Sequence, residues 1–152
     1  MYENPEDSHT IKSYIKNGGY KTLRSVLKDL NPQKVLDEVK ESNIRGRGGA
    51  GFPTGTKWGF LGEEESRYLV INADESEPGT FKDRILLERD PHQLIEGMII
   101  TSYASNISTS FIYIRGEYSK SARRVQAAID EAYENGFLGN NILGTDFSLD
   151  IT

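Results

Sequence analysis

The residues that could do chemistry are concentrated in a glycine-rich stretch that begins at Gly46. Seven of the fifteen glycines of the chain lie between Gly46 and Gly62. Because glycine has no Cβ atom, the main-chain amides around Ala50 and Gly51 can approach a ligand closely and form a cradle for an anion. The charge of Lys57 follows, and aromatic side chains flank the stretch at positions 52, 58 and 60. This combination predicts a site for a phosphorylated ligand that carries a flat ring.

Two common nucleotide motifs fit this stretch poorly. Gly46, Gly48 and Gly51 match the pattern GxGxxG, but that pattern indicates a dinucleotide site only when a strand precedes it, and here a helix is predicted. No Gly-Lys-Ser/Thr sequence occurs, so a Walker motif is excluded. A flexible connector is the alternative, although linkers are usually richer in serine and polar residues. Taken singly, Arg45 and Arg47 are more typical of solvated loop charges than of ligand contacts.

A second group of polar residues follows a predicted strand at residues 67–72. Asn72 ends this apolar run, and Asp74, Glu75 and Glu77 come directly after it. Ligands of open parallel sheets bind beyond the carboxyl ends of the strands. Carboxylates do not bind phosphate, but they accept hydrogen bonds from sugar or ribityl hydroxyls and from a flavin imide N–H. The alternative is a solvated turn, which Pro78 and the glycine after it favour.

Helix and strand patterns alternate along the chain around these residues. Residues 67–72 form a continuous apolar run, which predicts a strand buried on both faces. Right-handed crossovers between successive strands then predict an α/β fold with a Rossmann-like, three-layer parallel sheet, preceded by a short helical segment. Helical patterns occupy residues 10–16, 23–30, 31–39, 56–61, 90–103 and 119–135. Strand patterns occupy 67–72, 110–115 and 147–152, and residues 63–65 are expected to form a solvated acidic turn.

His92 and the two charges after the second strand each allow a structural and a functional interpretation. His92 lies in the first turn of the helix that Pro91 begins, where a solvated or hydrogen-bonded role is favoured over catalysis. Arg115 and Glu117 follow the second strand, where either charge could touch a ligand or the two could form an ion pair. The last strand pattern has no helix after it, which leads us to expect a fragment of a longer protein, incomplete at its C-terminus.

Composition limits the possible functions. The chain has 152 residues, no cysteine and two isolated histidines, which exclude a cysteine-based zinc site, a protein-held iron–sulfur cluster and a cysteine nucleophile. No metal site is expected, and redox chemistry would need a bound cofactor. The net charge of −5 argues against a nucleic-acid partner. No apolar run reaches the roughly eighteen residues of a membrane helix, so we expect a cytoplasmic protein without direct membrane insertion.

Taken together, the motifs closely resemble the NADH-binding flavoprotein subunit of respiratory complex I, the NADH-quinone oxidoreductase. The resemblance covers nearly the whole chain in the family's order and spacing. It is carried by Asn17-Gly18-Gly19-Tyr20, by residues 45–55 with Lys57-Trp58, by Asn72-Ala73-Asp74-Glu75 with residues 77–80 and 82–84, and by residues 113–118.

This resemblance implies the role of each candidate site residue. It implies that FMN is wrapped by Gly46, Arg47, Gly48 and Gly49 and supported by the charge of Lys57. Asn72, Asp74 and Glu75 would hold the polar edge and ribityl chain of the flavin. Phe52 and Phe60 would stack on the adenine of NADH, and Glu77 would lie near the nicotinamide. Hydride passes from NADH to FMN, so no side chain is expected to act as a nucleophile.

The same resemblance sets the expected organisation and partners. Residues 1–45 would form a helical N-terminal segment and residues 46–152 a truncated FMN- and NADH-binding domain. A 4Fe-4S cluster is expected only in the full-length family member, beyond Thr152. The implied partners are NADH and other peripheral-arm subunits of complex I, which would hold the protein at the inner membrane. The alternatives are a diaphorase subunit of an NAD-linked hydrogenase or formate dehydrogenase, or a non-catalytic nucleotide-binding or assembly fragment.

Overall fold

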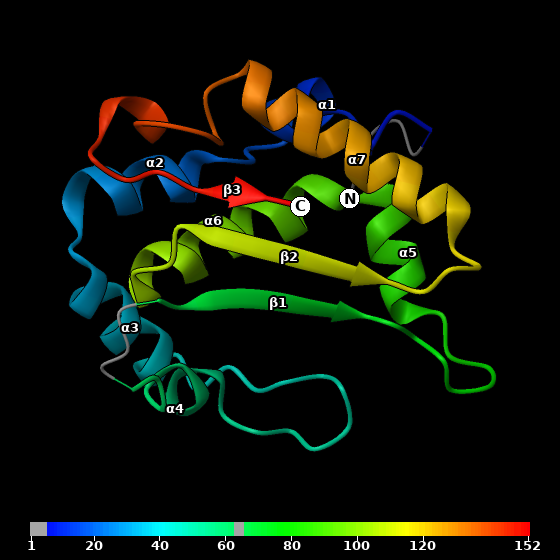
Figure 1. The fold of residues 1–152 in the computed structure, drawn as a ribbon, viewed down its shortest axis with the longest axis horizontal. Coiled ribbons are helices and arrows are strands. Elements are labelled where there is room, and N and C mark those ends of the chain that lie inside the picture. The colour runs from blue at the N-terminus through cyan, green and yellow to red at the C-terminus, as the bar shows by residue number, and fades with distance from the viewer. Residues whose placement is uncertain (1–5, 63–65) are drawn as a thin grey trace.

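Three parallel strands and a set of helices make up the computed structural model, which describes residues 6–62 and 66–152. The acidic turn expected at residues 63–65 lies outside the described residues. Figure 1 shows the course of the chain. The helices are α1 (Ile11–Lys16), α2 (Lys21–Asp29), α3 (Pro32–Glu41), α4 (Thr54–Trp58), α5 (Lys82–Arg89), α6 (Pro91–Ser105), α7 (Ser119–Glu134) and the short 3-10 helix η1 (Ile142–Gly144); the strands are β1 (Tyr68–Ala73), β2 (Thr109–Ile114) and β3 (Asp150–Ile151).

The sheet confirms the predicted α/β class and parallel arrangement. Its order is β1-β2-β3, with Tyr68 opposite Thr109 and Ala73 opposite Ile114 between the first two strands. The crossover from β1 to β2 runs through α5 and α6, and the crossover from β2 to β3 runs through α7. Two right-handed crossovers that advance in the same direction place their helices on the same face of the sheet. In Figure 1, β2 passes in front of α6.

The opposite face of the sheet is not covered by the described residues, so the expectation that the first strand is buried on both faces is wrong. The exposed fractions are 60% for Tyr68, 58% for Val70 and 65% for Tyr113. Leu69 and Ile71, which point to the other face, pack against the hydrophobic core. The sequence run is continuously apolar, but only its alternate residues meet the helices of this chain. The third layer of the expected fold is therefore not seen in the described residues.

One hydrophobic core fills the space between the covered face of the sheet and the helices. Ile95 and Ile99 of α6 and Ala132 of α7 are fully buried there, and Tyr20 and Leu23 bring α2 to the same core. Helix α3 begins at the cap that the sequence predicts. The Asn31 side chain accepts a hydrogen bond from the Lys34 N–H at 2.9 Å, with a proline at the first position of α3.

Three element boundaries differ from those predicted. Helix α5 was not predicted, because its residues read as part of the polar run after the first strand. The short helix near residue 56 runs from Thr54 to Trp58 instead. The last strand is confined to Asp150–Ile151, because the main chain of Leu149 pairs with Gly139 at 2.9 and 3.1 Å in an antiparallel bridge. Among the described residues, no helix has the length and apolar character that a membrane span requires.

Candidate functional site

The glycine loop (residues 46–52) is a closed loop between α3 and α4. An antiparallel bridge joins Arg45 to Pro53 at its base. The N–H of Gly46 donates to the carbonyl oxygen of Phe52 at 2.9 Å, and the guanidinium of Arg45 donates to the carbonyl oxygen of Gly51 at 3.2 Å. These bonds hold the two ends of the loop together and leave its middle free of partners from the rest of the described chain. In Figure 1 the loop extends from α4 along β1.

Glycine is required in the loop for backbone conformation and not for close packing. Gly49 and Gly51 adopt φ values of +116° and +62°, which residues with a Cβ atom rarely adopt. A Cβ atom placed at Gly48, Gly49 or Gly51 would meet no described atom within 4 Å. The space beside these glycines is therefore open, and their main chain can be reached by a ligand.

The open space belongs to a hollow of about 810 Å³ between the glycine loop, α4 and the edge of β1. A volume of this size lies within the range of small-molecule and cofactor sites. The hollow brings together eight of the thirteen predicted site residues: Gly46, Arg47, Gly48, Ala50, Gly51, Phe52, Lys57 and Asn72. It is also lined by Trp58, Leu61 and residues 68–71, and by Thr101, Ser105 and Ile107. The glycines of the first motif and Asn72 of the second, which lie more than twenty residues apart in the sequence, thus line one hollow.

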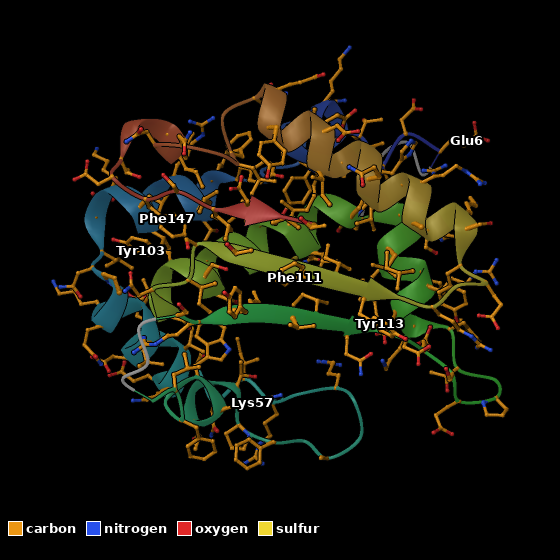
Figure 2. All side chains as sticks on the ribbon, viewed as in Figure 1. Glu6, Lys57, Tyr103, Phe111, Tyr113 and Phe147 are labelled. Atoms are coloured by element: carbon orange, nitrogen blue, oxygen red, sulfur yellow. The ribbon has the colours of Figure 1, made fainter. Side chains whose placement is uncertain are left out.

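Two cations line the hollow without a countercharge. Arg47 comes from the glycine loop, and Lys57, labelled in Figure 2, comes from α4. Neither forms an ion pair with any residue that the structure describes. Arg115, which follows β2, is instead paired with Glu117 at 3.0 Å. Uncompensated positive charge beside exposed main-chain amides is an arrangement that suits a phosphate group.

Exposed aromatic rings lie beside the glycine loop. The rings of Phe52 and Phe60 have their centroids 5.9 Å apart and are tilted by 53°. Both side chains are exposed, and Phe52 lines the hollow whereas Phe60 does not. Apolar rings without a protein partner on one face can stack on a planar ligand.

Only the first residue of the predicted acidic strand end lines the hollow. Asn72 does so, and its Oδ1 accepts a hydrogen bond from the N–H of Asp74 at 3.0 Å. Asp74 is exposed and accepts a hydrogen bond from the Ser76 hydroxyl at 2.8 Å. Glu77 is exposed on the same loop. Asp74 and Glu77 come after Asn72 in the sequence, but they do not line the hollow. Gly49 of the glycine loop does not line it either.

Glu75 differs from its neighbours because its side chain is buried. Its two carboxylate oxygens accept hydrogen bonds from the main-chain N–H groups of Asp83, at 2.9 Å, and Arg84, at 3.1 Å. Burial alone would raise the pKa of Glu75, but these two hydrogen bonds, together with the nearby charge of Lys82, leave that pKa below its ordinary value. The side chain therefore caps α5, a role that the sequence pattern did not indicate.

His92 has the hydrogen-bonded role that was favoured over catalysis. It is fully buried, its Nδ1 lies 2.9 Å from the Tyr20 hydroxyl and its Nε2 lies 2.9 Å from Glu131 Oε2. Because an ionised carboxylate can only accept, Nε2 carries the proton and the Tyr20 hydroxyl donates to Nδ1. Burial lowers the pKa of His92 more than the hydrogen bond to Glu131 raises it. Tyr20, the last residue of the Asn17-Gly18-Gly19-Tyr20 motif, thus belongs to the core of the fold.

Relatives of this chain are named as components of one enzyme, NADH-quinone oxidoreductase. The chain is 54% identical over 144 residues to such a component of Rhizobium meliloti, a match that covers 93% of this chain and 34% of the relative. It is 55% identical to the corresponding NADH-quinone oxidoreductase component of Aquifex aeolicus, over 94% of this chain and 34% of that relative. The chain therefore spans about a third of the length of these relatives.

Solved structures that match this fold are of an NAD+-reducing [NiFe]-hydrogenase. The crystal structure of an NAD+-reducing [NiFe]-hydrogenase in the H2-reduced state matches with a TM-score of 0.68 and 38% identity, covering 84% of this chain and 22% of the hydrogenase chain. The air-oxidized state matches with a TM-score of 0.70 and 33% identity, over 93% of this chain and 24% of that chain.

The family match covers the glycine loop and the whole sheet. Residues 39–151 match the family described as the Nuo51 FMN-binding domain. This range includes every residue that lines the hollow, and it confirms the family resemblance expected from the sequence. The chain belongs to the Nuo51 FMN-binding domain family.

Proposed function

We propose that this chain is the FMN- and NADH-binding part of an NADH-quinone oxidoreductase. The main support for the proposal is the shared hollow, which Arg47 and Lys57 line together with the glycine loop and Asn72. Family membership supports FMN as the cofactor, and the relatives named NADH-quinone oxidoreductase support NADH as its reductant. In this proposal residues 46–152 form the binding domain, and residues 1–45 form a helical segment that packs against it.

The residues of the hollow fit a phosphorylated flavin. The amides of residues 47–51 and the charges of Arg47 and Lys57 hold the phosphate, since a phosphate accepts hydrogen bonds from cations and from N–H groups that have no other partner. Asn72 supplies an amide to the ribityl chain or the polar edge of the flavin, and Asp74 accepts from its hydroxyls. The exposed rings of Phe52 and Phe60 provide a stacking surface for the adenine of NADH, with Glu77 toward the nicotinamide end.

The chain supplies binding and orientation, whereas the bound flavin supplies the redox chemistry by accepting a hydride from NADH. Stacking surfaces and hydrogen bonds hold two planar rings in contact, which converts a bimolecular encounter into a reaction between bound groups. No side chain of the hollow needs to form a covalent bond. Onward transfer of electrons to an iron–sulfur cluster and quinone, and docking to other peripheral-arm subunits, are part of the proposal for the longer protein.

A diaphorase subunit of an NAD-linked hydrogenase or formate dehydrogenase is the second candidate. The solved structures that share the fold favour it, since they belong to an NAD+-reducing hydrogenase. The two candidates use the same hollow and differ in the partner that receives the electrons. Purification of the native complex distinguishes them, because co-purification with a hydrogenase or formate dehydrogenase component supports the second candidate and excludes the first.

The proposed function is tested with the full-length protein under anaerobic conditions. We expect the purified protein to show the absorbance of an oxidised flavin and to lose it when NADH is added. A full-length protein that takes up no FMN on reconstitution rules the proposal out. Titration of the 152-residue chain with FMN and then NADH addresses the third alternative, because binding without flavin reduction indicates a non-catalytic module.

A further inference from the structure

The loop that follows β1 is fixed to the rest of the molecule through one residue, Glu75. Its exposed fraction is 5%, although it lies between two exposed residues, Asp74 and Ser76. Both carboxylate oxygens are engaged by the first turn of α5, through the N–H groups of Asp83 and Arg84. A carboxylate is favourable at this end of a helix because the N–H groups there have no partner within the helix.

The main chain of Glu75 is held from a second direction. Its carbonyl oxygen accepts a hydrogen bond from the Arg115 guanidinium at 3.2 Å and from the Tyr118 hydroxyl at 3.3 Å. Arg115 comes directly after β2, and Tyr118 comes directly before α7. One residue therefore joins the end of β1, the start of α5 and the connection from β2 to α7. We call this set of contacts the Glu75 anchor.

The anchor determines where the proposed ligand-binding residues of this loop can lie. Asp74 is directly before Glu75, and Glu77 is two residues after it. The remainder of the loop is held by local contacts, with the N–H of Thr80 donating to the carbonyl oxygen of Glu77 at 3.1 Å and Gly79 at a φ of +78°. The carboxylates of Asp74 and Glu77 are exposed, so the fixed point of the loop lies between them.

We propose that Glu75 is a positioning residue, which places Asp74 and Glu77 for the flavin and the nicotinamide and does not itself contact either ligand. This inference rests on the proposed function. It differs from the direct flavin contact that the family resemblance implies, because the carboxylate is buried and its acceptor positions are used within the protein. Besides the two N–H groups of α5, the Tyr118 hydroxyl lies 3.4 Å from Oε2 and Lys82 Nζ lies 3.7 Å from Oε1. The pKa of Glu75 is lowered despite burial, which agrees with an ionised carboxylate committed to donors within the protein.

The test uses the full-length protein and two substitutions that keep the shape of the anchor. Glu75→Gln removes the charge with little change in volume, and Tyr118→Phe removes only one hydroxyl. Glu134→Gln, in the last turn of α7, is the matched control, because Glu134 is exposed and lies outside the anchor and the hollow. Hydrogen exchange is measured on the flavin-free protein, and the Kd for FMN and the KM for NADH are measured on the same preparations.

A positioning role predicts changes both without and with ligand. In Glu75→Gln, the amides of Asp83 and Arg84 exchange about tenfold faster in the flavin-free protein, and the Kd for FMN or the KM for NADH rises by about tenfold, the scale of one lost charge-assisted hydrogen bond. Tyr118→Phe acts in the same direction by a smaller factor, and its effect is less than additive with Glu75→Gln because both act through one anchor.

Two results would overturn the inference. If ligand affinity falls while exchange at Asp83 and Arg84 in the flavin-free protein is unchanged, then Glu75 contacts the ligand directly. If exchange accelerates while FMN and NADH affinities stay at the values of the Glu134→Gln control, the anchor is structural only. A wild-type protein that binds no FMN contradicts the proposed function itself and the positioning role with it, and this outcome is recognised before any variant is compared.

Discussion

At the scale of single residues, Arg47 and Lys57 are notable because they line the hollow and also have no ion-pair partner among the described residues. Glu88, by contrast, is paired with Arg84 at 3.0 Å and with Lys120 at 2.9 Å. Positive charge that the folded chain leaves without a partner is available to an anionic ligand. This is the residue-level basis for the proposed phosphate site.

Replacement of Lys57 tests this basis. We expect Lys57→Met to raise the Kd for FMN by about tenfold or more, because it removes a charge-assisted contact to the phosphate. Lys28→Met, on the exposed side of α2, should leave the Kd unchanged. Flavin fluorescence titration of the full-length protein at two salt concentrations measures both. Equal affinity of the two variants for FMN would show that Lys57 does not contact the phosphate.

Several site residues could be predicted from the sequence because their chemistry is local. Glycines that adopt positive φ and a lysine within the next helix are visible as a pattern, and Asn72 is visible as the end of an apolar run. The role of Glu75 was not predictable in the same way. Its hydrogen-bond partners lie eight and nine residues further along, in a helix that the sequence pattern does not mark.

At the scale of elements, α4 positions Lys57 through its packing on α3. Gly55 is buried in this contact, and a Cβ atom there would meet the main chain of Lys40 at 2.7 Å. Glycine at this position is therefore a packing requirement, whereas in the glycine loop it is a conformational one. The sequence shows the glycine but not the helix that lies against it.

Gly55→Ala should displace α4 and with it Lys57. We expect a loss of about 1–3 kcal/mol of unfolding free energy from overpacking, together with a higher Kd for FMN. Gly97→Ala in α6 is the matched control, because a Cβ atom there meets no described atom within 4 Å. In a helix this exchange should stabilise by about 0.5–1 kcal/mol. Urea unfolding measures both variants, and equal stability would contradict the close α3–α4 contact.

A buried polar network joins the N-terminal helices to α6 and α7. The Glu96 carboxylate accepts hydrogen bonds from the Tyr14 hydroxyl at 2.5 Å and from the Leu23 N–H at 3.0 Å. Burial and the bond to Glu96 raise the pKa of Tyr14, so it stays protonated. His92 links the Tyr20 hydroxyl to Glu131 in the same region. The helical pattern of these segments was predictable, but the network that docks them involves residues more than seventy positions apart.

The lowered pKa of His92 makes stability depend on pH. The unfolded chain takes up a proton near the ordinary histidine value of about 6.5, whereas folded His92 resists protonation. The unfolding free energy should therefore fall as the pH drops from about 7.5 to about 5.5. We expect His92→Gln to be less stable at neutral pH by about 1–3 kcal/mol, since buried partners lose hydrogen bonds, and to show a smaller pH slope.

Urea unfolding at a series of pH values tests this prediction. Some slope should remain in His92→Gln because burial also lowers the pKa of His9. In the double variant with His9→Asn and His92→Gln, which serves as the control, most of the remaining pH dependence of the unfolding free energy should be lost. An unchanged slope in His92→Gln would show that the buried histidine does not resist protonation.

At the scale of the whole molecule, the sheet has helices on one face among the described residues. Figure 2 labels Phe111 and Tyr113 of β2, whose side chains are exposed like those of Tyr68 and Val70 of β1. The α/β class and the parallel strands followed from the alternation of patterns along the chain. The exposed face of the sheet could not be predicted in this way. An apolar run indicates that a strand is shielded from water, but it does not show which segment covers each face.

An apolar sheet face of this kind should promote self-association of the 152-residue chain. We expect Val70→Thr combined with Phe111→Thr to shift the chain toward the monomer in sedimentation velocity, while threonine keeps the strand propensity. Ile85→Thr removes a comparably exposed apolar residue from α5 and serves as the control. If the double variant and the control sediment alike, the sheet face does not drive association.

Whether the glycine loop holds a phosphate is tested by comparing the Kd for FMN with the Kd for riboflavin, which lacks the phosphate, on the full-length protein and its Lys57→Met variant. If the open amides and cations of the glycine loop hold the phosphate, the wild-type protein binds FMN more tightly than riboflavin by about a hundredfold. In Lys57→Met the ratio between the Kd for riboflavin and the Kd for FMN should be smaller. Equal affinity of the wild-type protein for FMN and riboflavin would contradict the account, because the glycine loop would then not be the phosphate site.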